Sequence, residues 1–258
     1  MSKISSYILS ILLVFTLNTF AQSSAYDTGE YFKFKIHYGI INAGFATVEL
    51  KEAVKNGKKV HHAVGYGWTT GVTKAVFKVE DDYQSYFDKV TNKPYEFIRK
   101  INEGGYTKDQ QGYFNQSNKT VLVKNYKKNT EKSFSVTTNV QDILSSFYYL
   151  RNHPNIDKLT IGEAIVIDMF FDDEIYKFKL KYLGKENLNT KFGKVSSLKF
   201  RPYVQSGRVF KEQESLTVWV SDDVNKIPLL VKADLAVGSL KASIIEAKKL
   251  QQPLTILK

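Results

Sequence analysis

The feature of this sequence that most constrains its fold is a two-residue alternation of apolar and basic side chains. It is clearest in residues 31–38, where the two sets are Phe32, Phe34, Ile36 and Tyr38 against Lys33, Lys35 and His37. Residues 176–183 repeat it, with Tyr176, Phe178, Leu180 and Tyr182 against Lys177, Lys179 and Lys181. Successive side chains of a β-strand point to opposite faces, so each segment is predicted to be a strand with one apolar and one basic face.

The same periodicity predicts further strands along the whole chain, separated by turn sequences. They are expected at residues 43–54, 59–68, 76–88, 94–102, 105–115, 119–124, 132–138, 163–171, 175–184, 194–204, 213–221, 227–235 and 239–249. Asn56-Gly57 is the clearest turn, because a type I′ hairpin needs positive φ at both central residues. The pattern predicts a mainly β fold, an antiparallel meander that forms a curved sheet with a barrel-like or sandwich architecture.

One segment departs from this rhythm and is predicted as a central α-helix at residues 139–152. Thr138-Asn139 offers an N-cap, and Asp142 would place an acid in the first turn, where the helix dipole favours it. Apolar residues then recur at helical spacing until His153-Pro154 ends the run. A short helical turn is also expected near Gly71–Ala75.

The helix would divide the chain into two β-rich halves, residues 22–138 and 153–250, which we expect to form one continuous domain. Residues 251–258 would form a tail, and residues 1–21 a signal peptide.

The N-terminus has the pattern of a cleavable signal peptide. Lys3 is followed by an apolar run at residues 7–20 and then by Ala21, after which we place the cleavage site. The run is short for a transmembrane helix, which needs about 20 residues. We therefore expect a periplasmic or secreted protein without transmembrane insertion. The chain has no cysteine, so it carries neither a disulfide nor a lipid-bearing cysteine.

The formal net charge of +11 favours anionic partners. Export argues against nucleic acid as that partner, which leaves anionic lipids and glycans, together with protein components of the envelope. The alternative is that the lysines only solvate the outer faces of the strands.

The sequence offers no motif for nucleophilic catalysis, since cysteine and a G-x-S-x-G elbow are both absent. The histidines lack the convergence that a zinc site needs, so no catalytic residue, metal or cofactor is predicted. The acidic clusters are Glu80-Asp81-Asp82, Asp172-Asp173-Glu174 and Asp222-Asp223. We interpret them as caps and turns, because Asp bonds readily to nearby backbone there, although facing carboxylates would suit glycoside hydrolysis.

Several spaced motifs resemble an exported bacterial family known as domain of unknown function 3108. They are Gly29-Glu30, Asn42-Ala43-Gly44, Asp142-Ile143-Leu144, Tyr149-Leu150-Arg151, Gly184-Lys185-Glu186, Phe192-Gly193-Lys194, Trp219-Val220-Ser221-Asp222-Asp223, Ile227-Pro228 and Ala236-Val237-Gly238-Ser239. Together they cover about residues 27–248. A common form of the family has Cys after the Gly193 turn, whereas this chain has Val195 and Ser196. The resemblance implies an envelope-associated β protein and carries over no active site.

Six residues combine chemical character with these motifs and are our candidates for ligand binding: Asp142, Arg151, Glu186, Trp219, Asp222 and Asp223. For Arg151 two roles are open, because it could anchor the helix end on backbone carbonyls or bind an anion.

Our leading hypothesis is a non-catalytic envelope protein that binds or chaperones a lipid-like or anionic glycan ligand. It predicts a cavity between the aromatic faces of the strands. The alternatives are an exported hydrolase of envelope polysaccharide, which would need two facing carboxyl groups, and a structural protein-interaction module.

Overall fold

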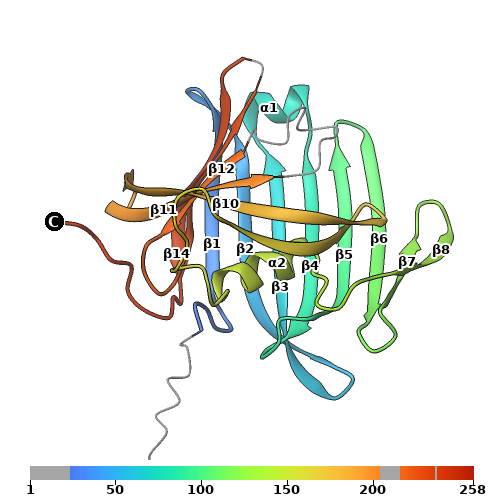
Figure 1. Ribbon diagram of the computed structural model, residues 1–258. Coiled ribbons are helices and arrows are strands. Elements are labelled where there is room, and N and C mark those ends of the chain that lie inside the picture. Colours follow the sequence, from blue (N-terminus) through green and yellow to red (C-terminus); the bar gives the residue numbers. More distant parts are fainter. Residues whose placement is uncertain (1–23, 204–215, 236) are drawn as a thin grey trace, which may run out of the picture.

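A computed structural model describes residues 24–203, 216–235 and 237–258 of the chain; the predicted signal peptide lies outside these residues. Within them, fourteen antiparallel strands form one curved sheet with the order β8-β7-β6-β5-β4-β3-β2-β1-β14-β13-β12-β11-β10-β9 (Figure 1). The strands are β1 (Tyr31–Tyr38), β2 (Ile41–Lys55), β3 (Lys58–Thr69), β4 (Glu80–Asp88), β5 (Pro94–Glu103), β6 (Tyr106–Asn115), β7 (Thr120–Asn125), β8 (Thr130–Ser135), β9 (Ala164–Phe171), β10 (Glu174–Thr190), β11 (Gly193–Tyr203), β12 (Leu216–Ser221), β13 (Pro228–Asp234) and β14 (Ser239–Lys248).

These strands confirm the mainly β, antiparallel meander that the alternation predicts. Asn56 and Gly57 both have positive φ, 51° and 74°, as a type I′ turn requires. Asp172 and Asp173, with φ of 50° and 66°, form the two-residue turn between β9 and β10. The short helical turn is also present, as α1 (Gly71–Val76), and β4 consequently begins at Glu80 rather than at residue 76.

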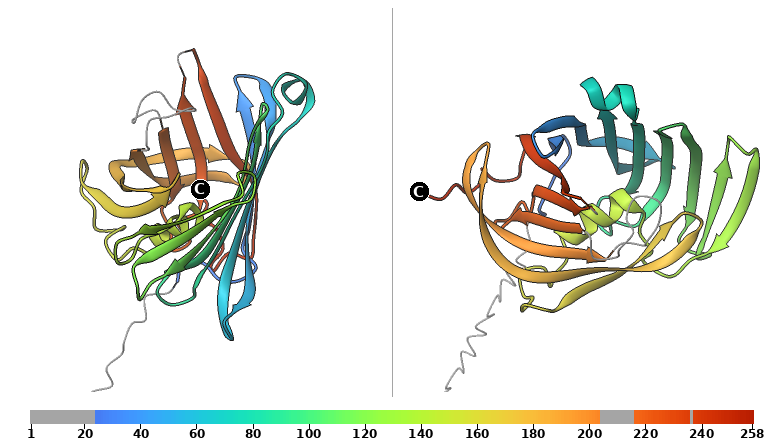
Figure 2. Two further views of the ribbon diagram at one scale, coloured as in Figure 1. Left: turned by 90° about the vertical axis from the view of Figure 1, so that its right-hand side faces the viewer. Right: turned by 90° about the horizontal axis from the view of Figure 1, so that it is seen from above.

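β1 joins the two predicted halves into one sheet. It pairs with β2 on one side and with β14 on the other, and a bulge occurs in each ladder. Bulges increase the twist and bend of a strand. Seen from above, the sheet curls from β1 in both directions around the central helix (Figure 2).

The central helix α2 (Ile143–Arg151) begins later than the predicted start at residue 139. Asn139 has a left-handed φ of 66°, and the backbone of Gln141 bonds to that of Asp168 and Phe170, so the chain stays extended. Asp142 is the true N-cap: its carboxylate accepts from the backbone N–H of Ser145, and its own N–H donates to Ser145 Oγ. This reciprocal capping box sets the helix start. The predicted cap at Thr138-Asn139 was therefore wrong.

The sheet does not close by strand pairing, because its ends β8 and β9 are not neighbours. Instead, the β9–β10 hairpin lies across strands of the first half, where Phe170 packs against Phe97, Phe114 and Phe134. α2 lies within the curve of the sheet and contacts β3, β4 and β9 (Figures 1 and 2). The fold is thus an open, curled sheet with one helix packed inside its concave face.

Candidate functional site

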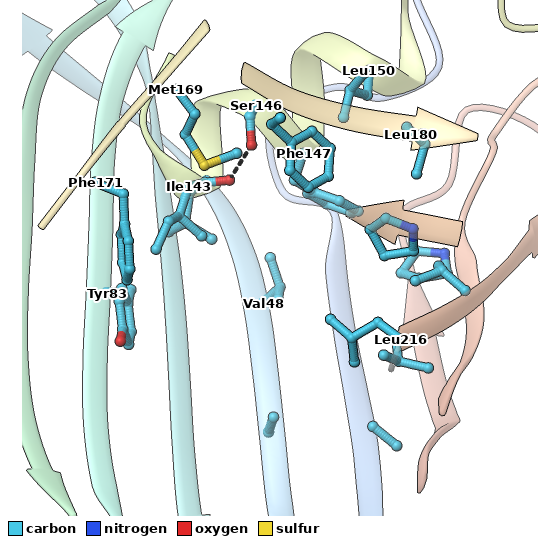
Figure 3. Close-up of a pocket in the computed structure, with 18 of the residues that line it drawn as sticks. Val48, Tyr83, Ile143, Ser146, Phe147, Leu150, Met169, Phe171, Leu180 and Leu216 are labelled. Carbon is cyan, nitrogen blue, oxygen red and sulfur yellow. Dashed lines mark hydrogen bonds between the residues drawn. The ribbon is translucent and has the colours of Figure 1, made fainter. Parts of the chain in front are cut away.

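A cavity of about 830 Å³ lies between α2 and the concave face of the sheet, and Ile143, Phe147 and Leu150 of α2 line it (Figure 3). Most of its wall is apolar. The aliphatic and aromatic lining includes Phe34, Ala46, Val48, Ile101, Ile143, Leu144, Phe147, Leu150, Met169, Phe171, Tyr176, Phe178, Leu180, Phe200, Leu216, Val218, Val231 and Ala242. Ligand cavities of proteins have volumes of roughly 300–1,000 Å³, so this one is large enough for a small-molecule ligand.

The two-residue alternation explains why these residues line the cavity. On β10, Tyr176, Phe178 and Leu180 point into the hollow, whereas the lysines between them point to the outer face. On β2, the small side chain of Ala46 lies beside Val48 and leaves the hollow unfilled. The aromatic faces predicted from the sequence therefore surround a cavity.

One wall of the cavity is polar, where β5 and β6 face the β9–β10 turn. Arg99 Nη1 donates to Asp172 Oδ1 at 2.6 Å, and Lys108 Nζ donates to the same oxygen. The Arg99 guanidinium lies 4.1 Å from the ring centre of Phe171 and 5.4 Å from that of Tyr83. We name Arg99, Lys108 and Asp172 the polar seam. It places two cations against one carboxylate.

Burial and charge act in opposite directions at the polar seam. Burial by itself would raise the pKa of Asp172, but the hydrogen bond from Lys108 and the charge of Arg99 outweigh it and hold the pKa below its ordinary value. The Arg99 side chain is 8% exposed, and its buried Nε has no hydrogen-bond partner among the described residues. Asp172 therefore stays ionised at neutral pH.

Arg151 lies at the end of α2 in a buried ion pair with Glu30. Its Nη1 and Nη2 donate to the two oxygens of Glu30 at 2.5 and 2.6 Å, and its remaining bonds go to the carbonyls of Ala25 and Asn225. The guanidinium also lies between four aromatic rings, those of Tyr26, Phe32, Phe147 and Tyr148. Arg151 could anchor the helix end or bind an anion. These contacts are those expected of the anchoring role.

Asp142 lies at the other end of α2 and is also buried. Besides capping the helix, its carboxylate accepts from Ser85 Oγ of β4 at 2.6 Å. Burial raises its pKa to about 6, against the opposing hydrogen bonds from Ser85 and Ser145. Asp142 thus ties the helix to the sheet.

Three other candidates gather on the outer face of the sheet. Val218 and Val220 line the cavity, so Trp219 between them points outward. Its Nε1 donates to Glu186 Oε2 at 2.9 Å. Asp222 Oδ2 accepts from Lys185 Nζ at 2.6 Å and from Ser196 Oγ at 3.2 Å. The cavity and this outer group are therefore on opposite faces.

Asp223 organises the loop between β12 and β13. Its carboxylate accepts from Ser221 Oγ at 2.7 Å and from the backbone N–H of Asn225 at 3.0 Å. It forms part of a loop at residues 222–227 rather than a tight hairpin.

Sequence reasoning missed the polar seam. Arg99 and Asp172 are far apart in the chain and meet only because the sheet curls. The weak signal that was available is a charged residue on the inward face of a strand. Arg99 shares that face of β5 with the buried Phe97 and Ile101 and interrupts its apolar pattern.

Among the residues that the structure describes, no three His, Asp or Glu side chains come together in a way that could hold a metal ion. Within the same residues, no helix has the length and apolar character needed to cross a membrane.

Comparison with known proteins gives a family and a fold. The sequence model of a family described as "Protein of unknown function (DUF3108)" matches residues 33–245. No curated protein matches the chain.

Among solved structures, the chain is similar to a beta-barrel-like protein of domain of unknown function DUF1849 from Brucella abortus. The TM-score is 0.55 at 8% sequence identity, and the match covers 85% of this chain and 97% of the other. A DUF1089 family protein from Pseudomonas aeruginosa matches with a TM-score of 0.30 at 9% identity, over 80% of this chain and 92% of the other. The first likeness supports the curled, barrel-like fold described above.

Proposed function

The chain belongs to the DUF3108 family of proteins of unknown function, and we propose that it is a non-catalytic protein that holds a lipid-like, amphiphilic ligand in its cavity. The observation that carries the proposal is the cavity of about 830 Å³ with a largely apolar wall, to which Arg99 and Asp172 of the polar seam contribute charged groups. Burial of apolar surface drives binding, at roughly 25 cal/mol per Å². Few polar groups then suffice to orient the ligand.

The polar seam supports an anionic head group on that ligand. Arg99 and Lys108 share the single carboxylate of Asp172, so this group carries one more positive charge than negative. A carboxylate or phosphate head would meet charge-assisted donors there. The apolar tail would then lie along the aromatic side chains of β10.

This arrangement favours a lipid over the anionic glycan that the net charge also allowed. A sugar presents hydroxyl groups over its whole length, and each buried hydroxyl needs a partner. The wall formed by Phe178, Leu180 and Val218 has no such partners to offer.

The hydrolase alternative would require two carboxyl groups that face each other, about 5–10 Å apart, with one able to donate a proton. At the cavity wall, Asp172 is held ionised by Arg99 and Lys108. The carboxyl groups of Glu103 and Glu174 also line the cavity, but most of the wall is apolar and favours an apolar ligand over a sugar. A purely structural interaction module would have no use for the cavity.

The net charge of +11 favours association with anionic surfaces such as those of an envelope. We therefore propose a periplasmic or secreted location after cleavage near Ala21, where the chain would carry or chaperone an envelope lipid.

A cavity-filling substitution tests the proposal. Ala46→Phe would place a ring in the hollow, whereas Thr47→Phe, one residue along β2, would place the same ring on the outer face. Binding of a fluorescent fatty acid is measured by titration. We expect Ala46→Phe to weaken binding at least ten-fold and Thr47→Phe to leave it unchanged. If the wild-type protein does not bind the probe, or if both variants bind like the wild type, the proposal fails.

A further inference from the structure

The two ends of the curled sheet differ in the side chains that their turns expose. At one end, uppermost in Figure 1, the β1–β2 turn, α1, the β5–β6 turn and the β13–β14 turn lie together. Their proximity is fixed by contacts: Tyr38 Oη donates to the Val237 carbonyl at 2.8 Å, and Thr70 N–H donates to the Ala43 carbonyl at 3.1 Å.

This end carries a set of exposed apolar side chains, which we name the apolar rim: Tyr38, Ile40, Ile41, Val72, Val76, Phe77, Leu235 and Val237. Turn tips are normally polar, yet Ile40 occupies the tip of the β1–β2 turn and is fully exposed. Val72 and Val76 on α1 are 78% and 82% exposed. Not one residue of α1 is buried.

The opposite end of the sheet has ordinary polar turns. They include Lys55-Asn56-Gly57-Lys58 between β2 and β3, and Asn115-Gln116-Ser117-Asn118-Lys119 between β6 and β7. Single valines are exposed there, Val54 and Val90. Isolated exposed valines are common on protein surfaces, whereas a gathered set marks an interaction site.

The apolar rim lies at the end where the cavity reaches the surface. Tyr106, at the β5–β6 turn, lines the cavity and is 42% exposed. Gly104 N–H donates to the Lys78 carbonyl at 2.8 Å, which joins this turn to the segment after α1. α2 floors the cavity away from this end (Figure 1). A ligand that leaves the cavity past Tyr106 therefore emerges beside the rim.

Several lysine side chains lie close to the apolar rim. Lys74 and Lys78 are about half exposed and lie 3.9 and 2.8 Å from one shared carboxylate, that of Glu80. Lys127 Nζ donates to Thr107 Oγ1, next to Tyr106. Cations beside apolar tips are complementary to a surface with anionic groups over an apolar interior.

We propose that the apolar rim docks on a lipid bilayer that contains anionic head groups, with its side chains from the β1–β2 turn, α1 and the β13–β14 turn inserted among the lipids. The rim side chains stand on separate segments of the chain, and a bilayer accepts each of them independently. The inference goes beyond the proposed binding function, because docking depends on the rim and not on occupation of the cavity.

Flotation with lipid vesicles tests the docking surface. The protein without residues 1–21 is mixed with vesicles of phosphatidylcholine, alone or in equal parts with phosphatidylglycerol. Ile40→Glu with Val76→Glu alters the rim, and Val54→Glu with Val90→Glu is the matched control, with the same charge change on exposed residues at the opposite end. Circular dichroism establishes that both variants are folded.

We expect the wild type and the control to float with the anionic vesicles, and the rim variant to bind them at least ten-fold more weakly. Lys74→Gln with Lys78→Gln should lower binding to anionic vesicles and reduce its dependence on salt. The proposal is overturned if the wild type floats with neither vesicle, which would assign the rim to a protein partner, or if the rim and control variants lose binding equally.

The Ala46→Phe variant separates docking from ligand binding. It should float like the wild type even where it has lost the fluorescent fatty acid. Loss of flotation in Ala46→Phe would show that the lipid association comes from the cavity, and would contradict docking through the rim.

Discussion

The guanidinium of Arg99 on β5 lies 2.6 Å from the carboxylate of Asp172 in the β9–β10 turn, and this ion pair joins β5 to a hairpin whose strands are not its neighbours in the sheet. It fastens the β9–β10 hairpin over the cavity where the backbone forms no closing ladder. Lys108 of β6 reinforces it from the next strand. Arg99 and Asp172 of the polar seam thus line the cavity, and the ion pairs of the seam also hold the β9–β10 hairpin in place. We call this second role the clasp.

Removal of the Asp172 carboxylate should destabilise the protein. Asp172→Asn leaves two largely buried cations, Arg99 and Lys108, with a neutral partner, and we expect a loss of about 2 kcal/mol in the free energy of unfolding at pH 7. Urea denaturation followed by tryptophan fluorescence measures it. Asp173→Asn is the control, because Asp173 lies in the same turn with φ of 66° and Asn tolerates that conformation. Equal losses in both variants would contradict the clasp.

The clasp should also depend on pH. The pKa of Asp172 is lowered in the folded state, so its stabilising contribution is present above its ordinary pKa and is lost as the pH falls through the lower folded value. The difference in unfolding free energy between the wild type and Asp172→Asn should therefore shrink at strongly acidic pH. If this difference in unfolding free energy does not change with pH, the charge of the Asp172 carboxylate does not contribute to stability.

Arg99 should select for the head group of the ligand. We expect Arg99→Gln to weaken binding of a long-chain carboxylic acid at least ten-fold while it changes binding of the matching alcohol much less, since only the acid uses the charge. Competition against the fluorescent fatty acid provides both affinities. If the affinities for the acid and the alcohol fall to the same extent, Arg99 determines the shape of the cavity and does not recognise the charged head group.

Breaking the buried ion pair of Arg151 and Glu30 should lower the free energy of unfolding of the ligand-free protein. Arg151→Met strands the Glu30 carboxylate in the core, which should cost about 3–5 kcal/mol. Adding Glu30→Gln to Arg151→Met should recover part of that loss, because the stranded charge is gone. Chemical denaturation of the two single variants and the double variant gives the coupling. Additive losses would contradict a structural pair.

Asp142 should make stability fall as the pH rises through the weakly acidic range. Its pKa of about 6 in the folded state lies above its ordinary 3.8, so its contribution is full below the lower value and is lost as the pH rises through the higher one. Asp142→Asn keeps the cap without titrating. Relative to this variant, the wild type should lose up to about 3 kcal/mol between pH 4 and pH 7. A relative stability that does not change with pH would contradict the buried acid.

The strands could be predicted because alternation is a local property of the sequence. The segments around Phe34 and Phe178 show which side chains share a face, and the structure confirms both strands. The helix start was harder, because Asn139 and Asp142 both suit a cap. The backbone bonds of Gln141 to the distant Asp168 and Phe170 decide between them.

The candidate site was predictable only in part. Alternation indicated aromatic faces, but the curl that turns those faces into a cavity depends on bulges and on contacts between distant strands. Arg99 and Asp172 meet for the same reason. The motif residues Glu186 of β10 and Trp219 of β12 share a hydrogen bond across the intervening strand β11, yet they lie on the face away from the cavity. Residue type and order along the chain do not reveal that difference.

Native mass spectrometry with lipid extraction, on protein purified from its own cells, tests the central claim most directly. The account predicts a co-purifying amphiphile with an anionic head and a long apolar tail, retained by the wild type and by Thr47→Phe and lost from Ala46→Phe. A wild-type protein that carries no such molecule, or an Ala46→Phe variant that carries the same amount, would contradict a lipid-binding cavity.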